Sequence, residues 1–158
     1  MTTKECSNCG ARLSGLICDY CGTMFGSVDT YEEDEKALEE YHRKLRTKDK
    51  NGQILFLKSG YIPDHTKLLI DAGLLCVGFM EESDMSISRT DAATARLEAI
   101  VMKLHLKPSD YESAQAIKMF EKRLAQYKRQ SFRTTVLGLG AIFVAIVAII
   151  FAIRYFTR

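Results

Sequence analysis

The sequence TTVLGLGAIFVAIVAIIFAI, from Thr134 to Ile153, contains no ionisable side chain in twenty residues. A helix rises about 1.5 Å per residue, so this stretch would be roughly 30 Å long, which is the thickness of the hydrocarbon core of a bilayer. A buried core helix is the alternative, but such a helix normally keeps a polar face. The stretch therefore predicts a transmembrane helix over 134–153. A short tail, 154–158, follows it, as in a tail-anchored protein.

Basic residues gather just before this apolar stretch. Residues 118–133 contain six Lys or Arg side chains and one acidic side chain, whereas residues 154–158 contain two Arg. Positive charge beside a membrane span is retained on the cytoplasmic side, so we expect a single-pass protein whose N-terminus faces the cytosol. Lys128, Arg129 and Arg133 would then lie at the anionic lipid headgroups. The membrane surface explains this basic cluster without nucleic acid.

Four of the five cysteines follow a C-x2-C-x8-C-x2-C pattern near the N-terminus. Each C-x-x-C pair can present two thiolates to one ion from a tight turn, and the glycine after each pair permits the positive φ of such a turn. A reducing cytosol favours metal binding over disulfides. We therefore predict that Cys6, Cys9, Cys18 and Cys21 bind one structural zinc ion. Rubredoxin-like iron binding and a redox dithiol are the alternatives.

The segment CSNCGARLSGLICDYCG resembles the short zinc-ribbon modules found at the N-terminus of many bacterial and archaeal proteins, including membrane-anchored ones. The likeness covers roughly residues 5–25 and implies small β hairpins around one zinc ion, in a domain over 1–25. A module this small buries few apolar side chains, so metal binding would supply its folding free energy, about 10–16 kcal/mol in zinc-finger peptides. Because the zinc-ribbon fold serves many purposes, the resemblance specifies a metal site and not a function.

The rest of the chain is predicted to be mainly α. Thr30 and Glu33 form a capping box that opens a charged linker helix over 30–50. Residues 53–107 have apolar side chains at helical spacing and predict a small helical bundle, with Cys76 in its core. A juxtamembrane helix over 109–133 follows. No Gly or Pro lies between 110 and 133, so this helix can continue into the transmembrane helix.

A seam that repeats every seven residues runs along this terminal helix. Its members are apolar in the cytosolic half and small in the membrane half, where small side chains let helices approach closely. The seam consists of Ile117, Phe120, Leu124, Tyr127, Gly138, Ala141, Ala145, Ala148 and Ala152. It predicts self-association as a homodimer. The alternative is that the cytosolic half packs on the protein's own bundle.

The sequence lacks the usual signatures of catalysis. Its three histidines are scattered, and no glycine-rich phosphate loop or nucleophile elbow is present, so we expect no enzyme activity. We predict a non-catalytic tail-anchored adaptor or assembly protein that presents the zinc ribbon to a cytosolic or membrane protein partner. One alternative is a self-assembling membrane subunit, an oligomer or pore built on the seam. A membrane-tethered nucleic-acid binder is the second, which the few basic residues of the ribbon disfavour.

Overall fold

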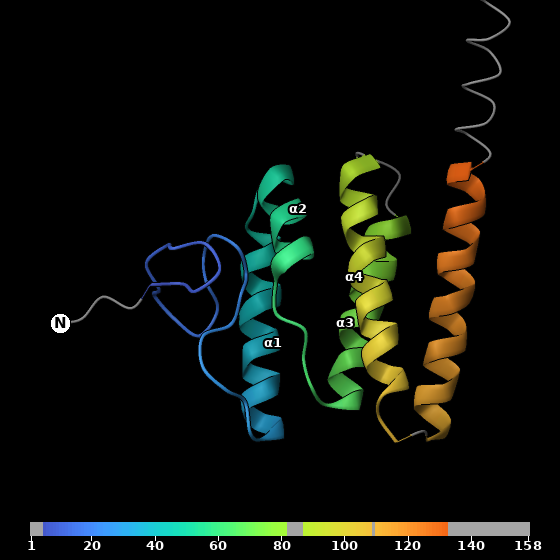
Figure 1. Ribbon diagram of the computed structural model, residues 1–158, viewed down its shortest axis with the longest axis horizontal. Helices are drawn as coiled ribbons and strands as arrows, with labels where there is room; N and C mark the ends of the chain where they lie inside the picture. Colours follow the sequence, from blue (N-terminus) through green and yellow to red (C-terminus); the bar gives the residue numbers. More distant parts are fainter. Residues whose placement is uncertain (1–4, 82–86, 109, 133–158) are drawn as a thin grey trace, which may run out of the picture. The chain divides into compact units, whose positions relative to one another are not determined.

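The computed structural model describes residues 5–81, 87–108 and 110–132. The chain divides into two compact units, Met1–Glu121 and Lys122–Arg158. The helices are α1 (Tyr31–Arg46), α2 (Lys50–Ser59), α3 (Thr66–Glu81) and α4 (Ile87–His105), followed by a helical segment over 111–132. Figure 1 shows how α1 to α4 follow the N-terminal loops.

The predicted capping box is present at the start of α1. The Thr30 side chain accepts a hydrogen bond from the Glu33 backbone N–H, and the Glu33 carboxylate accepts one from the Thr30 N–H. The predicted single helix over 30–50 is wrong at its end, because α1 stops at Arg46 and α2 starts at Lys50. Asp49 caps α2 by accepting a hydrogen bond from the Gly52 N–H at 2.8 Å. The Asn51-Gly52 pair therefore lies in the first turn of a new helix.

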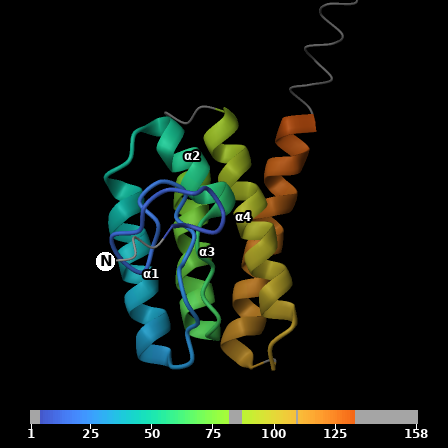
Figure 2. The same cartoon turned by 60° about the vertical axis from the view of Figure 1, so that its left-hand side comes forward.

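Helices α3 and α4 pack side by side, and α4 also packs against α2 (Figure 2). Their shared core is aliphatic and aromatic, and its fully buried members include Phe56, Leu57, Leu69, Cys76, Leu97, Ile100 and Leu104. Cys76 is completely buried, which confirms its prediction as a core residue. Burial of these side chains is the main source of stability for helices of this length.

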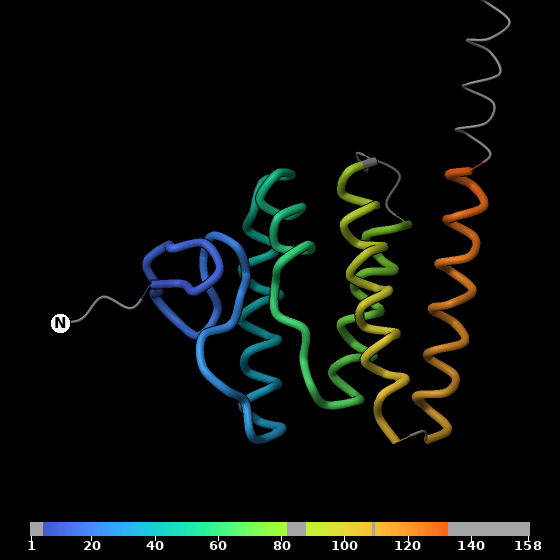
Figure 3. The backbone as a smooth tube through the Cα atoms, in the orientation of Figure 1, coloured from blue at the N-terminus to red at the C-terminus, as the bar shows by residue number. Residues whose placement is uncertain are grey.

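An extended connection joins α2 to α3 (Figure 3). Arg96 of α4 donates hydrogen bonds to the carbonyl oxygens of Gly60 and Tyr61 within it. The Arg96 guanidinium also lies 4.5 Å from the centre of the Tyr41 ring of α1. One buried side chain of α4 thus ties the connection and α1 to the bundle.

The predicted fold class needs correction at the N-terminus. The described residues contain no β-strand, so the predicted β hairpins of the zinc ribbon are wrong. Two single antiparallel bridges, Glu5 with Arg12 and Ile17 with Met24, occur in their place. Each loop turns back within a few residues to bring its cysteines together, which leaves room for one bridging pair and not for a ladder.

The predicted transmembrane helix is also without support in the described residues, none of whose helices combines the length and the apolar character needed to cross a membrane. The stretch 134–153 itself lies outside the described residues. The same is true of Arg133 and of the seam residues Gly138, Ala141, Ala145, Ala148 and Ala152. The fold class that the structure supports is a helical unit with an N-terminal pair of cysteine loops.

The cytosolic half of the predicted seam is partly used within the chain. Phe120 is fully buried, and its ring lies where a side chain at Gly73 of α3 would otherwise project. Leu124 is also buried, whereas Ile117 and Tyr127 are half-buried. Phe120 therefore packs on its own bundle, as the alternative to a self-association seam anticipated.

Candidate metal centre

Two cysteine loops with the same backbone geometry form the N-terminal part of the chain. In the first loop the Gly10 N–H donates to the Cys6 carbonyl at 2.8 Å, and in the second the Gly22 N–H donates to the Cys18 carbonyl at 3.0 Å. Both glycines have φ of 74°, a conformation that glycine adopts without steric cost. The sequence C-x-x-C-G therefore folds into a tight turn twice.

The two loops are related by a shift of twelve residues. The Cys6 N–H donates to the Ala11 carbonyl at 2.8 Å, and twelve residues later the Cys18 N–H donates to the Thr23 carbonyl at 2.9 Å. The two antiparallel bridges, Glu5–Arg12 and Ile17–Met24, obey the same shift. This duplication was not predicted, although the two C-x-x-C-G motifs begin twelve residues apart, at Cys6 and Cys18.

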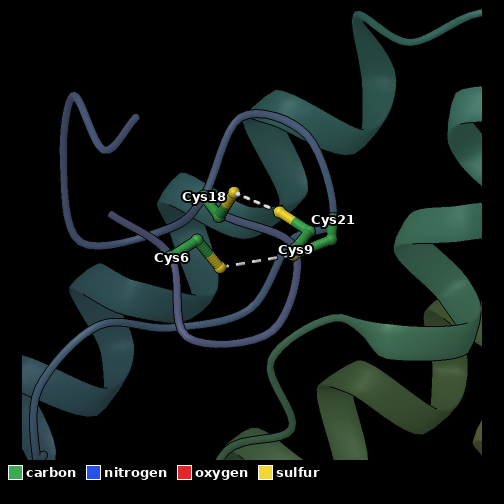
Figure 4. Close-up of side chains that lie close together, drawn as sticks. All are labelled: Cys6, Cys9, Cys18 and Cys21. Atoms are coloured by element: carbon green, nitrogen blue, oxygen red, sulfur yellow. Dashed lines mark hydrogen bonds between the residues drawn. The ribbon is translucent and has the colours of Figure 1, made fainter. Parts of the chain in front are cut away.

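The four cysteine side chains converge between the loops (Figure 4). Their Sγ atoms all lie within 4.8 Å of one another, and two of the pairs, Cys6–Cys21 and Cys9–Cys18, are 3.6 and 3.7 Å apart. A tetrahedral ion with metal–sulfur bonds of about 2.3 Å places its ligand sulfurs roughly 3.8 Å apart. A disulfide would require about 2.05 Å, and all four cysteines are free thiols. The cluster has the dimensions of a four-thiolate metal site.

Ionisation of the cluster is uneven. A hydrogen bond with the Ala11 backbone favours the Cys9 thiolate, but burial and the neighbouring sulfurs outweigh it and raise the pKa of Cys9 to about 12. Burial disfavours the Cys21 thiolate, yet its hydrogen bonding with the side chain and backbone of Thr23 outweighs burial and lowers the pKa of Cys21 to about 6. Four thiolates at this separation repel one another, so a bound cation is what allows all of them to ionise together.

Apolar side chains enclose the cysteine cluster. Cys6, Cys18 and Cys21 are buried, and Ala11, Leu13 and Leu55 pack against them. Leu55 belongs to α2, so the helical bundle supplies part of the wall. This arrangement leaves Cys9 as the more exposed ligand.

The second loop is hydrogen-bonded to the end of α2. The Ser59 hydroxyl donates to the Cys21 carbonyl at 2.8 Å, and the Thr23 hydroxyl donates to the Ser59 carbonyl at 3.2 Å. The Tyr61 N–H donates to the Gly22 carbonyl at 2.9 Å. A Cβ atom on Gly22 would lie 2.9 Å from the Phe56 ring, so glycine is also required here for the close approach to α2.

A buried lysine joins the second loop to α1. The Lys44 ammonium donates to the Ile17 carbonyl and forms ion pairs with Asp19 at 2.7 Å and Glu40 at 3.0 Å. Burial disfavours the ammonium, but the two carboxylates outweigh this effect and raise the pKa of Lys44. The cysteine loops are therefore anchored to both α1 and α2 and are not a freely hanging module.

The structure also brings together a histidine and a carboxylate that the sequence analysis treated as unrelated. Asp34 is fully buried in α1 and accepts hydrogen bonds from His65 Nδ1 at 2.7 Å and from the Tyr61 hydroxyl at 2.5 Å. It also accepts hydrogen bonds from the backbone N–H groups of Asp64 and His65, at 2.9 and 2.8 Å, just before α3 begins. All of these donors serve to anchor the start of α3. Thirty-one residues separate Asp34 from His65, so local spacing could not reveal the pair.

Comparisons with known protein families, with curated proteins and with solved structures find no match for this chain. The resemblance to zinc ribbons therefore rests on the four cysteines and their geometry. The grouping of Cys6, Cys9, Cys18 and Cys21 within metal-binding distance is shown by the structure.

Proposed function

We propose that this protein is a non-catalytic, membrane-attached adaptor whose four-cysteine centre holds one zinc ion and presents the surrounding loops to a cytosolic protein partner. The observation that carries the proposal is the closed cluster of four sulfurs anchored to α1 and α2. Zinc bound by four protein ligands has no free position for a substrate, which is typical of a structural site. The ion would neutralise the thiolates and cross-link the two loops.

A metal ion suits this donor set better than a redox dithiol does. Four thiolates in a tetrahedron are the ligands of structural zinc or of a single iron, and the choice between them is settled by metal analysis. A redox dithiol would be expected to pair two sulfurs at bonding distance on oxidation, whereas here the sulfurs form a single four-membered group. Structural zinc is the use that this geometry supports best.

Membrane attachment is proposed from the sequence of residues 134–153, and from the basic side chains that precede it. Of these, Lys128 and Arg129 are solvent-exposed in the described segment. The self-assembling membrane subunit is a weaker candidate because its seam would need Phe120, which the bundle already buries. The nucleic-acid binder gains no support from any basic surface on the cysteine loops.

The first test is metal analysis of purified protein. We expect about one equivalent of zinc in the wild type and in Cys76→Ser, because Cys76 is buried away from the cluster in α3. Cys9→Ser should lose most of the metal. Iron in place of zinc would change the identity of the ion, and absence of any bound metal from the wild type would contradict the proposal.

The second test addresses the adaptor role. The full-length protein is cross-linked in native membranes, purified and analysed by mass spectrometry, in parallel with a Cys6→Ser, Cys9→Ser form and with Cys76→Ser. A partner recovered with the wild type and with Cys76→Ser, but lost from the double variant, supports the adaptor. Recovery of self-cross-links alone, unchanged in the double variant, would instead favour the self-assembling subunit.

A further inference from the structure

The two cysteine loops share one backbone geometry but differ in what covers them. In the second loop, the turn at Cys21 and Gly22 is buried against the end of α2. In the first loop, the equivalent turn at Cys9 and Gly10 is exposed. A Cβ atom on Gly10 would meet no described atom within 4 Å, whereas one on Gly22 would lie 2.9 Å from the Phe56 ring. The duplication therefore leaves one of two equivalent surfaces uncovered.

The end of α2 fits the second turn through one ring and two hydrogen-bond donors. The Phe56 ring lies against Gly22, where the absence of a side chain permits the close approach. The Ser59 hydroxyl donates to the Cys21 carbonyl at 2.8 Å. The Tyr61 N–H donates to the Gly22 carbonyl at 2.9 Å. An aromatic side chain followed by two donors is thus the pattern that covers this turn.

The first turn presents the same groups to solvent. The carbonyls of Cys9 and Gly10 are the counterparts of those of Cys21 and Gly22, and neither accepts a hydrogen bond from any residue in the described part of the chain. Both turns have the same internal hydrogen bonds and the same glycine φ, so they hold these carbonyls alike. Covering a carbonyl costs free energy unless the covering chain supplies a donor. A segment that covers the first turn must therefore bring two donors.

The surroundings of the two turns indicate that a separate protein covers the first one. Beside the second turn, the bridge residues Ile17 and Met24 are buried and half-buried. Beside the first turn, the equivalent residues Glu5 and Arg12 are charged and exposed. A polar rim of this kind is typical of an interface between separate proteins. A second copy of this chain would not supply the covering segment, because its own α2 end is docked on its own second loop.

We propose that the turn at Cys9 and Gly10 binds the C-terminal end of a helix of a partner protein, with an aromatic side chain on Gly10 and donors on both carbonyls. The inference rests on the proposed adaptor function and specifies the chemistry of its partner. The bound segment would resemble residues 56–62, whose sequence is FLKSGYI. Ala11 stands where the second loop has Thr23, so the hydrogen bond from Thr23 to α2 has no counterpart in the partner complex.

The test uses nuclear magnetic resonance of the full-length, zinc-loaded protein in detergent. The probe is a capped peptide in which an alanine-rich helical stretch precedes the sequence FLKSGYI, because an isolated helix as short as α2 is marginal in water. We expect it to shift the backbone amide signals of Gly10 and Ala11 and to leave those of Gly22 and Tyr61 in place. Shifts at Gly22 and Tyr61 instead would mean that the probe displaces α2 from the second loop. That result, or no shift at all, would overturn the proposal.

A second peptide, identical except that Ala replaces Phe, tests the aromatic contact. We expect it to bind about tenfold more weakly, because the ring that lies on Gly10 is lost. Circular dichroism confirms that both peptides are helical. Equal affinities of the two peptides would contradict the proposal, and this comparison needs only the wild-type protein.

Two protein variants assign the binding to the first turn. In Gly10→Asn the side chain occupies the surface that the ring needs, while Asn tolerates the positive φ of the turn, so affinity for the FLKSGYI probe should fall about tenfold. Gly26→Asn is the matched control, because Gly26 also has a positive φ and open space around its Cβ position, and it should bind the probe normally. Zinc content is measured in both variants. Unchanged affinity in Gly10→Asn overturns the inference but leaves the adaptor itself standing, since metal content and partner cross-linking are measured separately.

Discussion

At the scale of single residues, Asp34 is a fully buried carboxylate that accepts hydrogen bonds from several donors. Burial alone would raise the pKa of its carboxyl group, but hydrogen bonds from Tyr61, His65 and the Asp64 backbone hold that pKa below its ordinary value. A buried carboxylate with this many donors is stable only while all of them remain in place. Asp34 therefore fixes the position of the α2–α3 connection relative to α1.

Replacement of Asp34 by Asn tests this role. The amide keeps one acceptor oxygen but directs an NH2 group at donors, so we expect a loss of about 2–3 kcal/mol in the free energy of unfolding. Asp71→Asn, at an exposed position of α3, should change it by less than about 0.5 kcal/mol. Urea denaturation followed by circular dichroism measures both. Equal effects of the two substitutions would show that Asp34 does not anchor the connection.

His42 makes stability depend on pH. Burial, together with Arg96 and Arg46, lowers the pKa of His42 from 6.5 to about 4, and its Nε2 atom has no hydrogen-bond partner among the described residues. The unfolded chain therefore takes up a proton as the pH falls below 6.5, while the folded protein resists protonation until about pH 4. The contribution of His42 to the free energy of unfolding is fully present above pH 6.5. It is lost as the pH falls from 6.5 to about 4.

His42→Phe removes the titration and keeps an aromatic ring. Both proteins are compared at pH 7.5 and pH 5. Over this range we expect the free energy of unfolding to fall by about 1 kcal/mol less in the variant than in the wild type, after allowance for partial solvent screening. Protonation of the cysteine cluster affects both proteins alike, so the difference between them isolates His42. Parallel stability curves across this pH range would contradict the assignment.

At the scale of helices, the contact between α3 and Phe120 depends on one glycine. A Cβ atom on Gly73 would lie 2.5 Å from Cζ of the Phe120 ring, whereas a Cβ atom on Gly78 of the same helix would have no described atom within 4 Å. Gly73→Ala should therefore destabilise the protein by about 1–3 kcal/mol, although Ala favours helix formation. Gly78→Ala should stabilise it by up to about 1 kcal/mol.

Thermal denaturation measures the stability of Gly73→Ala and of Gly78→Ala. Addition of Phe120→Leu to Gly73→Ala should restore part of the lost stability, because the smaller side chain vacates the space that the new methyl group needs. A stabilising Gly73→Ala would mean that the Phe120 ring moves aside without cost. Phe120 could then also take part in self-association, as the predicted seam requires.

The helices that local signals define were predictable from the sequence. The Thr30–Glu33 capping box marks the start of α1, and the apolar phase of Cys76 places it in the core. The break between α1 and α2 was not predictable from the sequence, because the charged residues around Asp49 continue the helical pattern of their neighbours. Contacts such as Phe120 on Gly73 join positions far apart in the sequence, which single-sequence periodicity does not reach.

At the scale of the first unit, the cysteine loops and the helical bundle form one continuous structure. The candidate site itself was predictable, since the spacing of two C-x-x-C-G motifs brings four sulfurs together by short-range geometry. The attachment of the cysteine loops to α1 and α2 was not predictable. It depends on Lys44, Ser59 and Tyr61, which are ordinary polar residues in the sequence and acquire their role through packing. The bundle therefore makes part of its contacts with the cysteine loops, and the cysteine cluster takes part of its wall, Leu55, from the bundle.

Lys44→Met separates docking of the loops from metal binding. Methionine has a similar length but cannot pair with Asp19 and Glu40 or donate to the buried Ile17 carbonyl, so we expect a loss of about 2–3 kcal/mol. Because the cysteines are untouched, zinc should remain bound, while hydrogen exchange of the second cysteine loop should accelerate. Lys58→Met, at an exposed position of α2, is the control and should alter neither. If Lys44→Met lost zinc along with docking, the bundle would be required to form the site. If it lost neither, the hydrogen bonds to α2 alone would suffice to hold the loops.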